Sequence, residues 1–278
     1  MKFALLGDTP DLLKLAKAAL RAGHTLTSVV EAGMIGRELQ RVAPQATRDA
    51  SWHGLLDPQW VDAVFVAPAE DEDRRAEQLR RLVQAGVALL AVHPLSDSML
   101  LYYELEMIRR ESHGLLTPYL ADAWHPAIDG LTEIVARRGS EFGDVEQVTF
   151  ERAMRQRTRT HVLRQFARDA YLLQAIAGAP TQLSAVAGPE GNARYQRLAV
   201  QLSTAAEVPV SWSIRPGSGG EAGSLTLVGS HGRCTLHMPG EGCPWTMDRQ
   251  LGGETERHQY GEIDLPVRAV ADFVAALD

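Results

Sequence analysis

The sequence predicts an α/β protein in which an N-terminal Rossmann-type parallel sheet is followed by an α+β domain with a mostly antiparallel, open sheet. Two observations carry this prediction. Up to about residue 140, short apolar runs alternate with amphipathic helical segments, the pattern of parallel strands joined by helical crossovers. After Gly143, strand-like runs follow one another across Gly- and Pro-rich turns, which is typical of antiparallel hairpins. We therefore expect two domains, residues 1–140 and 141–278.

The bulk properties exclude several classes of protein. The chain has 278 residues, a net charge of −7 and two cysteines. An acidic chain is not expected to bind nucleic acid or an anionic membrane surface, and two cysteines do not make a disulfide framework. The N-terminus has no apolar stretch typical of a signal peptide, and there is no run of about 18 apolar residues that would span a membrane. We expect a cytoplasmic protein.

Residues 2–30 read as a strand, a helix and a second strand. The apolar run 2–6 ends at Gly7, Thr9 can cap a helix, and Pro10 suits the first helical position because proline has no N–H to leave unpaired there. Gly23 ends the helix and the apolar run 25–30 follows. This order is a βαβ unit.

The same reading extends along the chain. In the first domain, strands are expected at 61–67, 87–92 and 114–118, and helices at 70–85, 96–112 and 124–137. In the second domain, strands are expected at 145–151, 181–187, 195–203, 207–214, 223–229 and 232–238, and helices at 162–177 and 266–277.

The turn after the first strand departs from a dinucleotide-binding turn. Such turns carry three glycines, which allow the tight turn, the close approach of the pyrophosphate and the packing of helix on strand. Gly7 serves the first purpose, but Thr9 and the bulky Leu12 stand at the other two positions. Pro10 removes an N–H that would face the anion, and Asp8 places a negative charge beside it. These residues disfavour a diphosphate.

Glu31 follows the second strand, at the position from which an acid binds the ribose of a dinucleotide. The alternative is that Glu31 is a solvated loop residue. The spacing alone does not separate the two.

Three segments resemble the Gfo/Idh/MocA family of glucose–fructose oxidoreductases, inositol dehydrogenases and rhizopine-catabolism proteins. They are "VDAVFVAPAEDEDRRAEQLRRLVQAGVALLAVHPL" (61–95), "DAYLLQAIAGAPTQLSAV" (169–186) and "SLTLVGSHGRCTLHMP" (224–239). The resemblance implies a Rossmann domain followed by a domain whose open sheet is a dimer interface or a substrate wall, and hence a homo-oligomer formed through the C-terminal sheet. It implies hydride transfer between NAD or NADP and a sugar or polyol carbon. The implied cofactor-binding residues are Gly7, Asp8, Thr9, Glu31 and Pro68.

The catalytic residues that the resemblance implies are largely replaced. The positions of the family's "EKP" motif hold Val92, His93 and Pro94, and the positions of its "D…H" pair hold Arg164 and Arg168. Arginine stays protonated and cannot accept a proton from an alcohol. His93 can do so in principle because its pKa lies near neutrality, and it is the candidate catalytic residue. The alternative is a strand-end histidine bonded to the backbone.

Arginines are concentrated between residues 152 and 168 of this acidic chain. Because arginine binds carboxylates and phosphates with two parallel hydrogen bonds, one hypothesis is an anionic ligand held by His161, Arg164 and Arg168. The other is that these arginines face solvent or make ion pairs between subunits. Trp124 and His125 are further candidates for contact with a sugar ring. The spacing of the histidines and cysteines fits no zinc pattern, so no metal is expected.

Two functions remain open on this basis. The first is a degenerate Gfo/Idh/MocA-like protein, a pseudoenzyme that binds a sugar-like or anionic small molecule, or serves in assembly, with little or no cofactor. The second is an NAD(P)-dependent oxidoreductase that acts on a sugar-like or anionic substrate through His93. The first is favoured, because the phosphate turn, the lysine and the histidine pair all differ from the family pattern.

Overall fold

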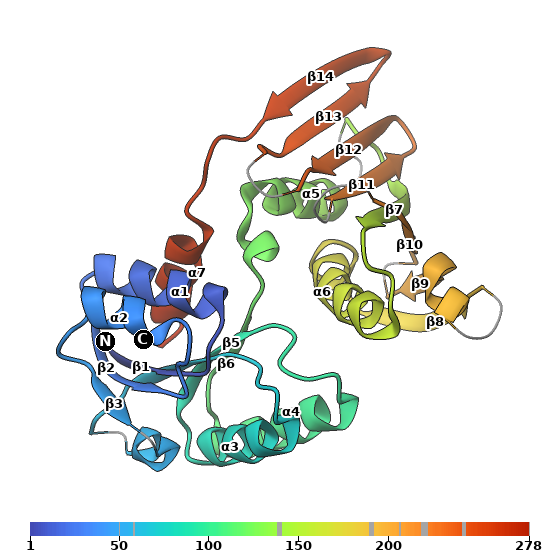
Figure 1. The fold of residues 1–278 in the computed structure, drawn as a ribbon. Helices are drawn as coiled ribbons and strands as arrows, with labels where there is room; N and C mark the ends of the chain where they lie inside the picture. The colour runs from blue at the N-terminus through green and yellow to red at the C-terminus, as the bar shows by residue number, and fades with distance from the viewer. Residues whose placement is uncertain are drawn as a thin grey trace. The chain divides into compact units, whose positions relative to one another are not determined.

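The computed structural model describes residues 1–49, 51–57, 59–137, 141–188, 192–205, 207–217, 222–240 and 243–277. These residues form two compact units, 1–124 together with 264–278, and 125–263. Figure 1 shows the elements of each unit. The predicted fold class is confirmed: a parallel sheet comes first in the chain and a mostly antiparallel sheet follows.

The first unit is built on a six-stranded parallel sheet with the order β3-β2-β1-β4-β5-β6. Its strands are β1 (Lys2–Leu6), β2 (Thr25–Val30), β3 (Thr47–Asp49), β4 (Ala63–Val66), β5 (Ala88–Val92) and β6 (Leu116–Tyr119). Its helices are α1 (Pro10–Arg21), α2 (Gly36–Val42), α3 (Glu72–Gln84), α4 (Met99–Ser112) and α7 (Leu265–Ala275), with short 3-10 helices η1 (Trp52–Leu56) and η2 (Ala121–Trp124). This strand order is that of a Rossmann fold.

Two apolar layers cover the two faces of this sheet. Phe3 and Leu5 of β1 point into a core that they share with α1, α2 and α7, whereas Ala4 and Leu6 point into a core shared with α3 and α4. Figure 1 shows α1, α2 and α7 on one side of the sheet and α3 and α4 on the other. Because both faces are buried, the strands are continuous apolar runs rather than alternating ones.

The start of α1 follows the local rules that the sequence predicted. Pro10 is the first helical residue, and the Thr9 hydroxyl accepts a hydrogen bond from the N–H of Leu12 (3.3 Å). A side-chain oxygen at this position satisfies one of the amide groups that a helix start leaves unpaired.

The second unit is built on an eight-stranded sheet with the order β14-β13-β12-β11-β7-β10-β9-β8. Its strands are β7 (Val145–Met154), β8 (Pro180–Val186), β9 (Ala199–Thr204), β10 (Pro209–Pro216), β11 (Ala222–Gly229), β12 (Gly232–Met238), β13 (Thr246–Leu251) and β14 (Glu254–Gln259). Its helices are α5 (Pro126–Ala136), α6 (Arg159–Ala177) and the 3-10 helix η3 (Asn192–Arg197). All described pairs of neighbouring strands are antiparallel except β10 and β7.

The register of this sheet gives it one apolar face and one polar face. One row of paired residues across the sheet is buried and consists of Met247, Leu236, Leu225, Phe150, Trp212 and Val200. Helix α6 lies on this face, because the Phe166 ring meets the Trp212 ring edge-on at 5.0 Å. The adjacent row faces the other way and consists of Asp248, Thr235, Thr226, Thr149, Ser211 and Gln201. The sheet therefore has an apolar inner face and a polar outer one.

The compact units divide the chain differently from the expected domains 1–140 and 141–278. The first unit ends at Trp124, so α5 belongs to the second unit, and α7 belongs to the first. Helix α7 buries Ala269, Val270 and Phe273 in the core of the first unit. The amphipathic pattern of α7 predicts that one face of the helix is buried. It does not predict which of the two sheets that face packs against.

The sequence prediction lacked four elements, α2, β3, β13 and β14, and the three short 3-10 helices η1, η2 and η3. Helix η3 ends at Arg197, so the strand expected at 195–203 begins only at Ala199. Strand β14 has the sequence ETERHQ, which is polar at every residue, and all six residues are exposed. It therefore lacks the alternation of apolar and polar residues by which strands are recognised. Among the described residues, no helix is long and apolar enough to cross a membrane.

Candidate functional site

The turn between β1 and α1 is the place where a Rossmann fold receives a diphosphate. Gly7 adopts a φ of +123°, and its N–H donates to the carbonyl oxygen of Val30 (3.0 Å). A Cβ atom at Gly7 would lie 3.0 Å from the Cβ of Ala67. Both the backbone angle and the close approach of Ala67, the residue after β4, therefore require glycine here, as expected from the sequence for the tight turn.

Asp8 joins this turn to the segment that follows β2. Its Oδ2 accepts a hydrogen bond from the N–H of Met34 (2.7 Å), and its Oδ1 accepts one from the N–H of Ile35 (2.9 Å). The two segments are so close that a Cβ atom at Gly33 would lie 2.8 Å from Asp8 Oδ2. In a dinucleotide fold the chain of the cofactor passes from the first turn to the end of the second strand. Asp8 bridges these two points.

The start of α1 has fewer free amide groups than a glycine-rich turn. Pro10 has no N–H, and the N–H of Leu12 is bonded to the Thr9 hydroxyl. A helix start binds anions through such amide groups together with its dipole. The dipole remains, but part of the hydrogen-bonding capacity is already used by the protein itself.

Glu31 is held by α3. It follows β2 with a φ of +57°, in the left-handed region. Its Oε1 lies 2.7 Å from Arg74 Nη2 and accepts a hydrogen bond from Gln78 Nε2 (2.9 Å), and its Oε2 accepts one from Arg75 Nη2 (2.9 Å). The side chain is 24% exposed. A ribose hydroxyl at this carboxylate would compete with three internal donors.

Arg75 explains why Glu31 is held in this way. Its side chain is 2% exposed and lies beside the first turn, because a Cβ atom at Gly7 would be 3.4 Å from Arg75 Nη2. Its Nε and Nη1 have no hydrogen-bond partner among the described residues. Burial lowers the pKa of the Arg75 guanidinium, and the charge and hydrogen bond of Glu31 oppose this effect. Glu31 is the counter-charge of a buried cation. No feature of the spacing in the sequence indicated this pair.

Pro68 and His93 follow β4 and β5, at the same edge of the sheet as Gly7. The N–H of His93 donates to the carbonyl oxygen of Tyr119 (2.8 Å), and the His93 ring meets the Tyr102 ring edge-on with centroids 6.0 Å apart. The Tyr102 hydroxyl accepts hydrogen bonds from the N–H groups of Leu95 (2.7 Å) and Ser96 (3.4 Å). Burial raises the pKa of the Tyr102 hydroxyl. His93 is half-buried, and its bond to Tyr119 is made by the main-chain N–H, so this bond does not decide between the catalytic and the strand-end interpretations of the ring.

Trp124 and His125 have structural partners in different units. Trp124 packs against the core of the first unit, and its carbonyl oxygen accepts a hydrogen bond from Arg268 Nη1 (3.0 Å). His125 is buried, and its Nδ1 accepts a hydrogen bond from the N–H of Ala127 (3.2 Å) at the start of α5. The His125 ring stacks on the Trp245 ring at 4.0 Å. A role in binding a sugar ring remains a prediction for both residues.

The arginine cluster is divided between different environments. Arg152 is buried and donates to both carboxylate oxygens of Asp169 (2.7–3.0 Å), and Asp169 is 0% exposed. Gln165 Nε2 (2.9 Å) and Trp212 Nε1 (2.8 Å) donate to the same carboxylate. Arg152 is therefore a structural residue of the second unit.

The three predicted anion-binding residues lie on α6. His161 is exposed in its first turn, and its Nδ1 lies 2.7 Å from the capping hydroxyl of Thr158. Arg164 is exposed and Arg168 is half-buried. No described contact joins the three into one site.

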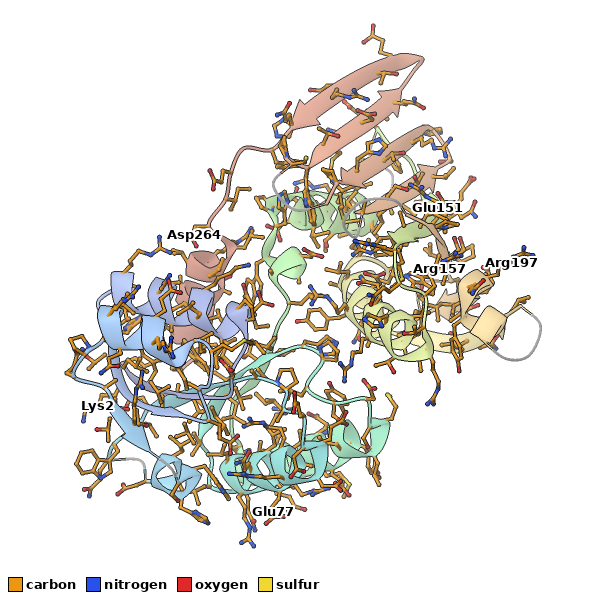
Figure 2. The ribbon with its side chains drawn as sticks, viewed as in Figure 1. Lys2, Glu77, Glu151, Arg157, Arg197 and Asp264 are labelled. Carbon is orange, nitrogen blue, oxygen red and sulfur yellow. The ribbon has the colours of Figure 1, made fainter. Side chains whose placement is uncertain are left out.

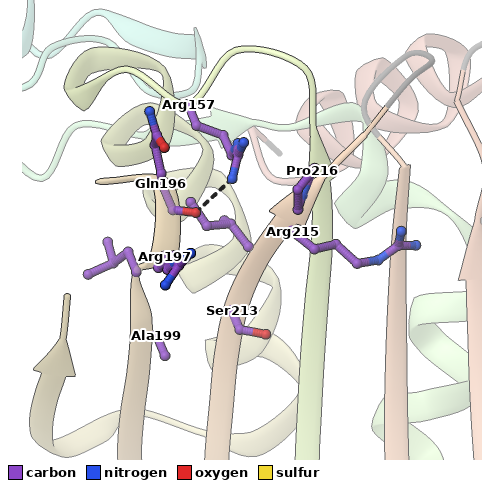
Figure 3. A pocket seen from close by; sticks show the side chains of 9 residues that line it. Arg157, Gln196, Arg197, Ala199, Ser213, Arg215 and Pro216 are labelled. Atoms are coloured by element: carbon purple, nitrogen blue, oxygen red, sulfur yellow. Dashed lines mark hydrogen bonds between the residues drawn. The ribbon is translucent and has the colours of Figure 1, made fainter. Parts of the chain in front are cut away.

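The structure instead brings Arg157 into a cavity of about 380 Å³ at one end of the second sheet, with Arg197 and Arg215. Figure 2 shows Arg157 and Arg197 in this part of the second unit. In Figure 3 the Arg157 guanidinium points to Gln196, whose carbonyl oxygen accepts its hydrogen bond (2.8 Å), and Arg215 extends toward the neighbouring strand. Among the described residues that line the cavity there is no carboxylate. Arg157 belongs to the arginine-rich stretch 152–168 but was not among the predicted anion-binding residues, and its two neighbours in the cavity come from η3 and β10.

The described residues contain no group of three or more histidine, cysteine or acidic side chains that could hold a metal ion. Cys234 is buried and Cys243 is exposed.

No protein-family model matches the sequence, and no curated protein matches it. Solved structures match over the full chain. KijD10, a 3-ketoreductase from Actinomadura kijaniata in complex with NADP and TDP-benzene, has a TM-score of 0.76 at 15% identity, covering 100% of this chain and 89% of its own. UDP-N-acetylglucosamine 3-dehydrogenase GnnA from Acidithiobacillus ferrooxidans has a TM-score of 0.77 at 18% identity, covering 99% and 88%. The chain has the fold of these oxidoreductases. The fold that the resemblance implied is confirmed.

Proposed function

We propose that this chain is a Gfo/Idh/MocA-like pseudoenzyme, a protein with an oxidoreductase fold that binds an anionic, sugar-like molecule and does not carry out hydride transfer. The observation that supports this most directly is the bridge from Asp8 to the N–H groups of Met34 and Ile35. It closes the first turn onto the segment after β2, where the adenosine half of a dinucleotide would pass. The residues present therefore do not fit a nicotinamide dinucleotide.

Glu31 supports the same proposal by a separate argument. A cofactor that recruited the Glu31 carboxylate would weaken its bonds to Arg75, whose guanidinium is almost completely buried. Removing the partner of a buried charge costs about 3–5 kcal/mol. That cost would be subtracted from the free energy of cofactor binding.

The arginine cavity supports an anionic ligand. Arg157, Arg197 and Arg215 are without a carboxylate partner among the described residues, although the chain contains 35 acidic residues against 28 basic ones. Guanidinium groups bind phosphate oxygens through paired hydrogen bonds. Two proteins of the same fold are named for contact with nucleotide-linked compounds, TDP-benzene and UDP-N-acetylglucosamine. We therefore propose a sugar bearing a diphosphate or a carboxylate as the ligand class.

Calorimetric titrations test this function. NADH and NADPH are expected to bind with Kd above about 1 mM, equivalent to less than about 4 kcal/mol. UDP-N-acetylglucosamine and UDP-glucuronic acid are the probes for the arginine cavity, and at least one is expected to bind more tightly than either dinucleotide. Arg157→Gln is expected to weaken that binding, with Arg233→Gln as the control. Micromolar binding of NADPH to the unmodified chain would overturn the proposal.

The second candidate function is an NAD(P)-dependent oxidoreductase that acts through His93. The observation in its favour is the position of His93, half-buried at the carboxyl end of β5, where the resemblance places a catalytic lysine. In that case His93 would accept the proton of a substrate hydroxyl. Oxidation of NADPH by a keto-sugar nucleotide, lost in His93→Ala, would favour this candidate over the first.

We also propose that copies of the chain associate through the polar outer face of the second sheet. Hydroxyl groups on this face are paired across strands, with Ser211 Oγ donating to Thr149 Oγ1 (3.3 Å) and Thr226 Oγ1 lying 3.2 Å from Thr235 Oγ1. Small side chains of this kind allow two sheets to pack closely. Ser211→Arg is expected to reduce the mass measured by light scattering, and an unchanged mass would contradict the proposal.

A further inference from the structure

A cavity of about 540 Å³ lies between helix α5 and the β13–β14 hairpin, entirely within the second unit. This volume is in the range of pockets that bind small molecules. Gly130 and Ile134 line it from α5, and Met247 and Arg249 line it from β13. None of the residues lining the arginine cavity lines this one.

Arg249 is a hydrogen-bond donor in this cavity that lacks an acceptor. Its Nε is buried and has no partner among the described residues, and no described carboxylate forms an ion pair with it. Its partner across the hairpin is Glu256, but the two side chains do not form a salt bridge. Because buried polar groups in proteins are nearly always hydrogen-bonded, an exception of this kind calls for an acceptor from outside the chain.

Tyr260 supplies a second donor and an aromatic wall. Its hydroxyl donates to the sulfur of Met247 at 3.8 Å, a weak bond that an oxygen acceptor would improve on. Its ring meets the His125 ring at 5.1 Å and the His258 ring at 4.5 Å, both edge-on, so its orientation is fixed by neighbours. A tyrosine hydroxyl is protonated at neutral pH and can therefore donate, and burial raises the pKa of this one further.

The charged residues that line the cavity indicate which charged groups a ligand would need. Glu133 forms an ion pair with Arg137, at 3.1 Å. The remaining charged residues of the lining are Arg249, Glu141 and Glu256. A simple anion would be attracted by the first and repelled by the other two. A molecule with both a carboxylate and an ammonium group satisfies all three.

We propose that this cavity binds a small zwitterion with an apolar side chain, the chemistry of an α-amino acid. The carboxylate accepts hydrogen bonds from Arg249 Nε and the Tyr260 hydroxyl. The ammonium group faces Glu256 and Glu141. The apolar side chain lies on Met247, Ile134 and the Tyr260 ring. This site is separate from the proposed function and stands or falls independently of it.

The test is calorimetric titration of the full chain with L-phenylalanine and L-leucine. Saturable binding of at least one is expected. For the amino acid that binds, the analogue without the ammonium group and the analogue without the carboxylate (3-phenylpropionate and 2-phenylethylamine in the case of phenylalanine) are each expected to bind at least about tenfold more weakly, because each loses a charge-assisted hydrogen bond. Absence of saturable binding of both amino acids, or equal binding of the three compounds, would overturn the proposal.

Two variants and a matched control locate the site. Arg249→Gln is expected to weaken binding at least about tenfold, and Tyr260→Phe, which keeps the ring, about threefold or more. Arg257→Gln is the control, because Arg257 lies on the same hairpin but pairs with Asp248. It is expected to leave binding unchanged. If Arg249→Gln does not fold, Tyr260→Phe decides alone. Unchanged affinity in the folded test variants, or equal loss in Arg257→Gln, would overturn the assignment.

Discussion

The Asp8 carboxylate accepts a hydrogen bond from the backbone N–H of Ile35 at 2.9 Å, and Ile35 is the residue that precedes helix α2. The Asp8 carboxylate thus binds the amide groups just before α2, and Asp8 itself lies just before the start of α1. In a nucleotide-binding protein such amide groups bind phosphate oxygens. Here an internal anion already uses them. This relationship underlies the proposal that the chain does not use a dinucleotide.

Replacing Asp8 should restore part of the affinity for a dinucleotide. Asp8→Ala removes a negative charge from the diphosphate position and frees the N–H groups of Met34 and Ile35. Two like charges about 4 Å apart at a protein surface repel by about 4 kcal/mol, so a gain of at least about tenfold in NADPH affinity, roughly 1.4 kcal/mol, is a conservative expectation. Fluorescence titration of both proteins with NADPH measures it.

The control for this experiment is Asp11→Asn, because Asp11 lies in the first turn of the same helix but does not join it to the segment after β2. It is expected to change NADPH affinity much less than Asp8→Ala. Equal gains in the two variants would mean that only the overall charge near α1 matters, and the bridge would not be the cause.

The Glu31–Arg75 pair should contribute strongly to the stability of the first unit. Glu31→Ala leaves the Arg75 guanidinium buried and without its counter-charge, so the free energy of unfolding should fall by about 3 kcal/mol. Arg74 pairs with the same carboxylate, but its side chain is 55% exposed. Arg74→Ala should therefore cost less than about 1 kcal/mol. Urea denaturation followed by circular dichroism distinguishes the two, and equal losses would contradict the assignment.

The sequence predicts the framework of both sheets because the relevant signals are local. Thr9 and Pro10 mark the start of α1, and the apolar runs of β1, β4 and β5 are those of strands buried on both faces. Strand β14 carries no such signal, since the segment Glu254–Gln259 is polar throughout. The adjacent Gly252 and Gly253, both with positive φ, mark the turn of the hairpin. A Gly-Gly pair of this kind is a recognised hairpin signal and was the one available clue.

The candidate sites depend on long-range contacts, so the sequence predicts them only in part. The position of Asp8 indicates a disturbed nucleotide turn, but its bond to Ile35 depends on how the segment after β2 folds back. Arg75 reads as one more charge on an amphipathic helix, and its burial beneath the first turn becomes visible only in the structure. Arg197 and Arg215 lie far from Arg157 in the chain, and η3 and β10 bring them to the lining of the same cavity.

Asp169 should be essential for the stability of the second unit. Its buried carboxylate receives hydrogen bonds from Arg152, Gln165 and Trp212. Asp169→Asn removes the charge that compensates Arg152 and turns one acceptor into a donor, so a loss of about 3–5 kcal/mol is expected. Asp248→Asn is the control, because Asp248 pairs with the exposed Arg257 and should cost less than about 1 kcal/mol. Comparable denaturant midpoints for the two variants would contradict this role.

The two cysteines should react at very different rates. Burial raises the pKa of the Cys234 thiol to about 11, whereas Cys243 is exposed. Because the thiolate is the reactive form, Ellman's reagent at pH 8 should modify one thiol per folded chain rapidly and the second only after addition of urea. Cys243→Ser should abolish the rapid phase, and Cys234→Ser should leave it intact. Rapid modification of both thiols in the folded chain would contradict the burial of Cys234.

The same thiol predicts how stability depends on alkaline pH. An unfolded cysteine ionises near pH 8.5, and the folded-state pKa of Cys234 is raised to about 11. The unfolded chain therefore releases this proton first, so the contribution of Cys234 is fully present below about pH 8.5 and is lost as the pH rises toward 11. Urea midpoints measured between pH 8 and 11 should fall less in Cys234→Ser than in the unmodified chain. An identical fall in the two proteins would show that other groups control stability in this range.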